Sequence, residues 1–108
     1  MLIDYRESDG ILRVQLTGEL GHHEAIRLMR DLSDLARQLV PRKMVLDCTP
    51  LDFMDSSGIA VVLQTAKECR NLGCVLSVCG VGRQAMRVLS AAGVPKLVPV
   101  TERGRTNV

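Results

Sequence analysis

The spacing of apolar residues changes once in the first part of this chain, and this change constrains the fold more than any other feature. Over residues 11–17 apolar and polar residues alternate, which predicts a strand with one buried face. Over residues 25–39 the apolar residues recur at helical spacing, which predicts an amphipathic helix that ends before Pro41. A strand that leads into such a helix is typical of an α/β domain, in which helices cover a sheet.

The later segments repeat this order of strand and helix. Residues 2–7 form another expected strand, joined to residues 11–17 through Asp9-Gly10, a strong hairpin signal. Further strands are expected over residues 44–48, 75–79 and 97–100, and further helices over residues 57–72 and 83–92. Strands alternating with helices require right-handed crossovers. The sequence therefore predicts an α/β fold with a mixed, mostly parallel β-sheet, an N-terminal β-hairpin and amphipathic helices.

The length of 108 residues fits a single domain, expected over residues 1–101 and followed by a frayed tail over residues 102–108. The last expected strand should lie at a sheet edge, because Pro99 cannot donate a hydrogen bond to a neighbouring strand. Three loops follow strands and should share one rim of the sheet, where ligands or partners bind in such folds. These loops are residues 18–23, 49–57 and 80–82.

Charge is distributed unevenly along the chain. Residues 1–65 contain seven Lys or Arg against ten Asp or Glu, while residues 66–108 contain seven against two. An acidic partner could meet these late basic residues, although solvated surface charge is the favoured explanation. They include Arg83, Arg87, Lys96, Arg103 and Arg105. Tyr5 and Phe53 are the only aromatic residues, so platforms for stacking bases are absent and no nucleic-acid partner is expected.

The cysteines and the N-terminal segment restrict the class of protein further. Cys48, Cys69, Cys74 and Cys79 form no C-x-x-C pair and are not interleaved with histidines, which predicts buried free thiols and no metal site. Residues 1–7 lack the basic and apolar regions of a signal peptide, and no apolar run approaches ~18 residues. We therefore expect a cytoplasmic protein without a membrane partner.

Two hydroxyl groups and a glycine stand at the expected start of the helix over residues 57–72. They belong to the segment Phe53-Met54-Asp55-Ser56-Ser57-Gly58. The first N–H groups of a helix lack intrahelical partners and the helix dipole is positive there, so a phosphoryl group on Ser56 would be tolerated. Taken alone, the two serines are better explained by simple N-capping of the helix.

Together with an upstream motif, this segment resembles a known family. The upstream motif is Gly18-Glu19-Leu20-x-His22-His23-x-Ala25. The combination resembles the STAS-domain anti-sigma factor antagonists (anti-anti-sigma factors), most of all the SpoIIAA-like members that act in sporulation. The resemblance implies a STAS-like fold and regulation of transcription by partner switching. The unphosphorylated antagonist binds an anti-sigma factor with serine kinase activity and so releases the sigma factor. Phosphorylation of Ser56 ends this binding, and a serine phosphatase restores it.

The resemblance also assigns roles to individual residues. The kinase supplies ATP, Mg²⁺ and the catalytic base, so this chain is expected to be no enzyme and to need no cofactor; the free protein is expected to be a monomer. The expected partner-binding residues are Gly18, Glu19, Gly21, His22, His23, Asp55, Ser56, Ser57 and Gly58. The family pattern usually has aspartate where this chain has Gly21, so one acidic group is missing beside the expected phosphorylation site.

The residues around Ser56 suggest how phosphorylation would weaken a complex. Asp47, Asp52 and Asp55 lie within nine residues of Ser56, so a phosphate would concentrate negative charge there. In this interpretation Ser57 caps the helix, and Gly58 keeps the face open for the kinase.

Three other functions fit parts of the sequence. A hydrolase built on Ser56 and either His22 or His23 would lack the G-x-S-x-G turn, and adjacent histidines do not share a helix face as metal ligands would. Gly80-Val81-Gly82 begins a G-x-G-x-x-A pattern, with Glu102 about 20 residues further on, as in nucleotide-binding domains. That pattern normally lies in the first strand–helix unit, however, and here it lies in the last. A STAS domain with a signalling or scaffold role unrelated to sigma factors also fits.

Overall fold

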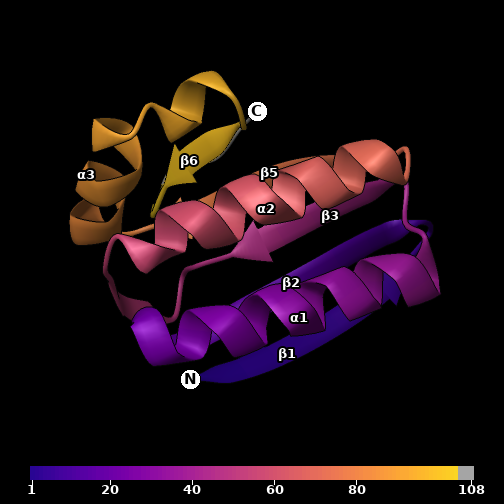
Figure 1. Cartoon of the computed structure of the whole chain (residues 1–108), viewed down its shortest axis with the longest axis horizontal. Helices are drawn as coiled ribbons and strands as arrows, with labels where there is room; N and C mark the ends of the chain where they lie inside the picture. The colour runs from indigo at the N-terminus through magenta and orange to yellow at the C-terminus, as the bar shows by residue number, and fades with distance from the viewer. Residues whose placement is uncertain (105–108) are drawn as a thin grey trace.

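The computed structural model describes residues 1–104, which form a six-stranded sheet and three α-helices (Figure 1). The strands are β1 (Leu2–Ser8), β2 (Ile11–Leu20), β3 (Lys43–Asp47), β4 (Leu51–Met54), β5 (Val75–Val81) and β6 (Val100–Glu102). The helices are α1 (His22–Leu39), α2 (Ser57–Asn71), α3 (Arg83–Ala91) and the short 3₁₀ helix η1 (Val94–Lys96). The predicted fold class is confirmed.

The sheet follows the order β1-β2-β3-β5-β6, and β4 extends it by pairing with the end of β2. Among the described strands only β1 and β2 are antiparallel, and the other pairs are parallel. The turn between β1 and β2 has positive φ at Asp9 (53°) and at Gly10 (80°). These are the angles that an Asp-Gly pair favours in a two-residue hairpin, so this element formed for the expected reason.

The apolar faces of the sheet and of the first two helices meet in one buried layer. α1 and α2 lie side by side across one face of the sheet (Figure 1). Leu12 and Val14 of β2 and Leu28 and Leu32 of α1 point into this layer and are fully buried. Burial of one such side chain stabilises a fold by roughly 1.5–3 kcal/mol. Because strand side chains alternate, the polar residues of β2 point to the opposite face, which no described helix covers. We call it the open sheet face.

One strand was not expected from the sequence. Residues 49–57 were expected to form a continuous loop, but β4 lies within them and runs parallel to the end of β2. Its two end residues, Leu51 and Met54, are buried, while Asp52 and Phe53 are exposed. The strand therefore lacks the alternation of buried and exposed residues that made β2 predictable from the sequence. The consequence is that Ser56 follows an ordered strand closely and does not lie in a free loop.

The last strand begins three residues later than expected, at Val100 instead of Leu97, because the backbone N–H groups of Leu97 and Val98 bond back to the carbonyl oxygen of Val94 in η1. It does form an edge of the sheet, as Pro99 led us to expect. The carbonyl group of Pro99 accepts a hydrogen bond of 2.9 Å from the backbone N–H of Val78 in β5.

The boundary expected after residue 101 was also wrong. Glu102 belongs to β6, and the guanidinium group of Arg103 donates a hydrogen bond of 2.9 Å to the carbonyl oxygen of Leu51. These two residues are therefore tied to the sheet and to β4. The remainder of the expected tail, residues 105–108, lies outside the described residues.

Candidate functional site

The two sequence motifs meet where β2 and β4 end side by side. β2 leads into α1 through Gly21, and β4 leads into α2 through Asp55 and Ser56. The backbone N–H of Asp55 donates a hydrogen bond of 3.0 Å to the carbonyl oxygen of Leu20. A Cβ atom on Gly21 would lie 3.6 Å from Oδ2 of Asp55. We call this surface the rim site; it comprises Gly18, Glu19, Gly21, His22, His23, Asp55, Ser56 and Ser57.

The carboxylate of Asp55 caps the start of α2. Its Oδ1 accepts a hydrogen bond of 2.8 Å from the backbone N–H of Ser57, and its carbonyl oxygen accepts one of 3.0 Å from the N–H of Gly58. This is an Asx turn that leads directly into the helix. The expectation that Ser57 caps α2 was therefore wrong, because Ser56 is the N-cap residue and Asp55 binds the N–H groups of Ser57 and Gly58.

Ser56 is the more accessible of the two serines. It is the N-cap residue of α2, its side chain is exposed, and its hydroxyl group makes no capping hydrogen bond. Its φ and ψ, −61° and −17°, already belong to the helical region. Ser57 is half-buried and takes part in the helix. Of the two hydroxyl groups, that of Ser56 is thus the better placed to reach a second protein.

Gly58 has a packing role that differs from the one expected. It is buried, and a Cβ atom there would lie 2.4 Å from both Cγ and Sδ of Met54. Met54 is itself fully buried. The glycine therefore lets α2 start close against the end of β4. It does not keep a surface open for a kinase, and it offers no exposed group to a partner.

The start of α1 is held by a side chain within the helix. Oε1 of Glu24 accepts a hydrogen bond of 2.9 Å from the backbone N–H of Gly21, the N-cap residue. This is half of a capping box, because the other half needs an N-cap side chain, which glycine lacks. Gly21 has φ of −110° and ψ of −172°, an extended conformation that any residue can adopt. The backbone would therefore accept the aspartate of the family pattern.

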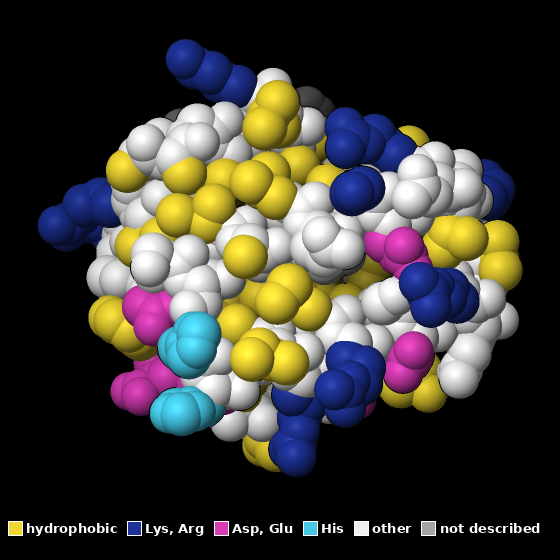
Figure 2. All heavy atoms as spheres, in the orientation of Figure 1, with side chains coloured by type: hydrophobic (Ala, Val, Ile, Leu, Met, Phe, Trp, Pro, Cys, Tyr) yellow, Lys and Arg dark blue, Asp and Glu magenta, His cyan; other side chains and the backbone are white. Residues whose placement is uncertain are grey.

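His22 and His23 are exposed on the first turn of α1, with ring centroids 6.1 Å apart and a T-shaped arrangement. Figure 2 shows both rings on the surface, with acidic side chains beside them. Within residues 1–104, no three His, Cys, Asp or Glu side chains are grouped so that they could hold a metal ion. Glu19 is also exposed at the rim site, and Gly18 (φ 106°) is half-buried beside the backbone of Met1.

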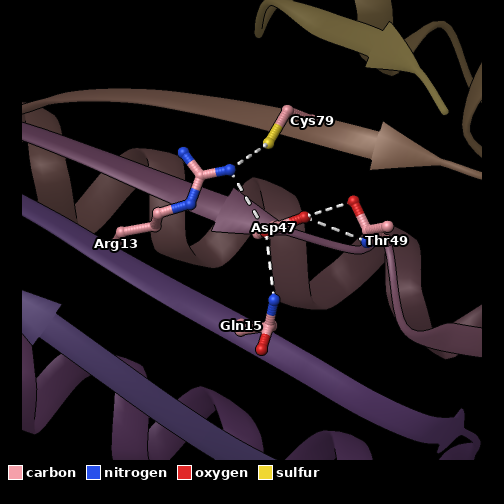
Figure 3. A network of polar contacts seen from close by, with 5 residues as sticks. All are labelled: Arg13, Gln15, Asp47, Thr49 and Cys79. Carbon is pink, nitrogen blue, oxygen red and sulfur yellow. Dashed lines mark hydrogen bonds and ion pairs between the residues drawn. The ribbon is translucent and has the colours of Figure 1, made fainter. Parts of the chain in front are cut away.

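Asp47 lies in a different environment, on the open sheet face (Figure 3). Its Oδ2 accepts hydrogen bonds from Arg13 (3.1 Å) and Gln15 (3.3 Å), and its Oδ1 accepts two from Thr49, from the N–H (3.0 Å) and the hydroxyl group (2.7 Å). The residue is only 5% exposed. Burial alone would raise the pKa of Asp47, but these hydrogen bonds outweigh it and hold the pKa below its ordinary value.

This arrangement corrects one expectation from the sequence. Asp47 was grouped with Asp52 and Asp55 as negative charge near Ser56. Its carboxylate is instead ion-paired with Arg13 on the face that the helices do not cover. Asp47 therefore adds little uncompensated charge to the rim site.

Comparison with known proteins identifies the family. The family model of the STAS domain matches residues 3–105. The chain belongs to the STAS domain family. The anti-sigma F factor antagonist of Paenibacillus polymyxa is 32% identical over 98 residues, which cover 91% of this chain and 84% of that protein. The predicted family is thus confirmed.

Solved structures agree with this fold. An anti-sigma factor antagonist from Mycobacterium paratuberculosis has a TM-score of 0.82 at 20% identity, covering 93% of this chain and 84% of that one. The anti-sigma factor antagonist SpoIIAA in its unphosphorylated form has a TM-score of 0.79 at 20% identity, covering 98% and 100%. At these identities the likeness concerns the fold.

The glycine loop of this STAS domain is filled by its own side chains. Gly80 has φ of 68°, and a Cβ atom there would lie 2.1 Å from Oγ1 of Thr49. A Cβ atom on Gly82 would lie 3.2 Å from a guanidinium nitrogen of Arg103. Both glycines are thus explained by close packing against Thr49 and Arg103. The geometry favours a tight strand-to-helix turn over a nucleotide site.

Two residues that support the rim site were missed in the sequence. Gln84 of α3 forms a pair of hydrogen bonds with the backbone of Met54, from the N–H of Met54 to Oε1 (2.9 Å) and from Nε2 to the carbonyl oxygen (2.6 Å). Arg103 binds the carbonyl oxygen of Leu51 at the other end of β4. Both contacts join residues at least 30 positions apart, and no local pattern signals them.

The cysteines follow the expectation in three of four cases. Cys48, Cys69 and Cys74 are buried, and Cys79 is half-buried beside Arg13. Burial raises the pKa of Cys48 to about 12 and that of Cys69 to about 12, so both stay protonated thiols at neutral pH.

Over residues 1–104, no helix is at once long enough and apolar enough to cross a bilayer.

Proposed function

We propose that this STAS domain is an anti-sigma factor antagonist whose binding is switched off by phosphorylation of Ser56. In its unphosphorylated form it binds an anti-sigma factor with serine kinase activity, and the sigma factor is released. A serine phosphatase removes the phosphate and restores binding. The observation that carries the proposal is the exposed hydroxyl group of Ser56 at the start of α2, beside the start of α1. This hydroxyl group makes no capping hydrogen bond.

The chemistry of the rim site supports a phosphoacceptor at Ser56. The hydroxyl oxygen would form a bond to the γ-phosphorus of ATP as the bond to ADP breaks, and the kinase would take the hydroxyl proton. The capping of α2 rests on Asp55 and leaves the Ser56 hydroxyl available. The helix start also favours negative charge through its dipole, so the phosphate would be tolerated within the folded chain.

The charges around Ser56 support loss of partner binding on phosphorylation. A phosphoserine adds a charge of about −1.5 to −2 at neutral pH. Glu19 and Asp52 are exposed, Asp55 and Glu24 are half-buried, and all four lie in the two segments that meet at the rim site. A partner that binds here would face a strong increase in negative charge. Repulsion and desolvation of the phosphate would both weaken the complex.

The similarity to the curated relative supports the choice of partner. That relative is an anti-sigma F factor antagonist, and the match extends over most of both chains. We infer a similar role here, in a cytoplasmic protein that acts without catalytic residues, cofactor or metal of its own. The partner-binding surface would comprise the rim site, without Gly58, which is buried.

A phosphorylation assay tests this proposal. The full chain is incubated with the anti-sigma factor kinase from the same genome and Mg-ATP, and its peptides are analysed by mass spectrometry. We expect phosphate on Ser56 in the native chain and in Ser57→Ala, and none in Ser56→Ala. Phosphate on Ser57 would contradict the assignment of the acceptor. Absence of any complex between the unphosphorylated chain and the kinase would contradict the proposed function itself.

A further inference from the structure

A shallow apolar groove runs along the solvent side of α2. Its volume is about 440 Å³, and its apolar lining comes from α1, α2 and the segment that follows η1. The apolar lining residues are Met29, Ala60, Leu63, Ala66, Leu97 and Val98. Figure 2 shows apolar side chains gathered across the middle of this face of the molecule. We call this depression the α2 groove.

The floor of the α2 groove is continuous with the core, because Val98 is buried and Met29, Leu63 and Ala66 are half-buried against it. The buried stripe of α2 that faces the sheet includes Val61, Val62 and Thr65, and the groove uses other residues of the same helix. Leu97, at one wall, is 71% exposed. A side chain of this size gains by leaving water, so its exposure next to other apolar side chains indicates a surface that another molecule covers.

The rim of the α2 groove is basic. Lys67 and Arg70 line it directly, Lys96 precedes Leu97, and no acidic residue lines the groove. Within residues 1–104, none of these three basic side chains forms an ion pair or side-chain hydrogen bond. The nearest acidic residue of α2, Glu68, is already bound by Ser33 and Arg37 of α1. Three of the basic residues that follow position 65, Lys67, Arg70 and Lys96, therefore surround the apolar α2 groove.

From this geometry we propose that the α2 groove is a docking site for an acidic amphipathic helix of a partner protein. Its apolar side chains would lie against Met29 and Leu97, over the small side chains of Ala60 and Ala66, which permit close approach. Its acidic side chains would flank Lys67 and its basic neighbours. The lining from Ala60 to Arg70 spans about 15 Å of α2, enough for roughly three turns of a bound helix.

This docking site extends beyond the proposed switch. Ser56 and Lys67 are 11 residues apart in the sequence, which places the basic rim about 16 Å along the axis of α2 from the phosphorylation site. The rim site offers acidic groups and histidines to a partner, and the α2 groove offers apolar and basic groups. The proposal does not depend on phosphorylation of Ser56, so either could fail without the other.

A designed peptide tests the proposal with the full chain. The probe is a synthetic helix of about 18 residues with leucine at helical spacing and glutamate on the flanks; its counterpart has lysine at every glutamate. We expect the acidic peptide to shift the backbone amide resonances of residues 60–70 and 97–98 in a ¹⁵N-labelled sample. The basic counterpart should shift them at least tenfold less at equal concentration. Equal shifts with both peptides, or acidic-peptide shifts confined to other surfaces, would overturn the proposal.

Matched variants then separate the groove from general surface properties. Leu97→Asp should weaken binding of the acidic peptide about tenfold or more, while Leu2→Asp, at a residue of equal exposure (72%) on the edge strand, should not. Lys96→Glu should weaken binding about threefold to tenfold, and Lys43→Glu on β3 should leave it unchanged. If Leu97→Asp fails to fold, Leu97→Ala replaces it in the same binding measurement. Equal losses in each variant and its control would refute docking in the groove.

Sedimentation of the free chain provides a further test. We expect a monomer, because the basic rim of one copy would face the basic rim of another. A dimer that Leu97→Asp dissociates would show that a second copy covers the groove, and it would overturn the proposal of an acidic partner helix. The same would follow if the native chain bound anionic lipid vesicles and failed to bind the acidic peptide.

Discussion

Two aspartates of this molecule have the same local geometry and opposite surroundings. Asp47 and Asp55 each stand at the end of a strand that pairs with β2. In each, Oδ1 accepts a hydrogen bond from the backbone N–H two residues later, at 3.0 Å from Thr49 and at 2.8 Å from Ser57. The residue in the middle of each turn differs. It is the buried thiol of Cys48 in the first turn and the exposed hydroxyl of Ser56 in the second.

The second carboxylate oxygen shows what this difference means. In Asp47 it accepts hydrogen bonds from Arg13 and Gln15, so the charge is neutralised and the turn is fixed to β2. In Asp55 it accepts no hydrogen bond within residues 1–104 and lies towards Gly21 of the neighbouring motif. The same turn is therefore structural where the sheet surrounds it and available to a partner where it ends at the rim. A functional assignment has to come from the surroundings of the carboxylate.

The largest expected effect is on stability, at Asp47. Asp47→Ala removes four hydrogen bonds and leaves the polar groups of Thr49, Gln15 and Arg13 without their acceptor. We expect a loss of about 2–3 kcal/mol in the free energy of unfolding, measured by urea denaturation. Asp55→Ala should cost about 1 kcal/mol, the usual value for loss of a helix cap. Equal losses at the two positions would break the comparison.

The elements of this fold also differ in how strongly the local sequence determines them. The alternating residues of β2 and the helical spacing in α1 carry their signal in neighbouring positions, and both elements formed nearly as predicted. β4 was missed because it is short, does not alternate and is held by β2, Gln84 and Arg103, which are distant in the sequence. The displacement of β6 has a local cause instead: the N–H groups of Leu97 and Val98 bond back to the carbonyl oxygen of Val94 in η1, so these residues do not join the strand.

The site was predictable as a set of motifs and not as a set of roles. The structure brings the segment around Ser56, the proposed phosphorylation site, beside the upstream motif. The capping role of Asp55, the packing role of Gly58 and the neutralisation of Asp47 all depend on distances between segments. Counting Asp47 among the charges near Ser56 failed because sequence separation does not tell to which face of a sheet a residue points.

The second expected effect is on partner binding, at Ser56. Ser56→Asp adds charge to a rim that is already acidic, so affinity for the anti-sigma factor should fall about tenfold, or 1.4 kcal/mol. Ser56→Ala should bind as the native chain does. The deficit of Ser56→Asp should shrink as salt approaches ~1 M, where the screening length is about 3 Å.

Calorimetric titration at two salt concentrations measures this effect. Ser8→Asp is the control, because Ser8 of β1 pairs with Ile11, so the same charge is added about 30 Å along β2 from Leu20. A similar loss of affinity in Ser8→Asp would point to net charge, and similar affinities for Ser56→Asp and Ser56→Ala would show that charge at Ser56 is not the switch.

A smaller effect should appear as pH falls. The pKa of Asp47 is lower in the folded chain than its ordinary value of 3.8, so the folded state holds the carboxylate more strongly ionised than the unfolded state does. The resulting stabilisation is complete above about pH 5, begins to fall near the unfolded pKa and is lost as pH falls through the lower, folded pKa. Asp47→Asn lacks it at every pH. The difference in unfolding free energy between native chain and variant should therefore narrow from pH 6 to pH 2.5, and a constant difference would contradict a lowered pKa.

The smallest effect concerns Gly21, where the rim site lacks the aspartate of the family pattern. The negative φ of Gly21 permits any residue, so a polar side chain at this N-cap should complete the capping box with Glu24. Gly21→Ser should stabilise the chain by a few tenths of a kcal/mol. Gly21→Asp should gain less at low salt, because its Cβ would lie 3.6 Å from Oδ2 of Asp55 and 3.0 Å from Oε1 of Glu24. Urea denaturation in low and high salt distinguishes the contribution of the cap from that of the added charge. The free energies of unfolding of the two variants should converge as the salt concentration rises. If Gly21→Asp exceeds Gly21→Ser at low salt, the free oxygen of Asp55 does not repel charge at the rim, and the contrast with Asp47 loses its electrostatic basis.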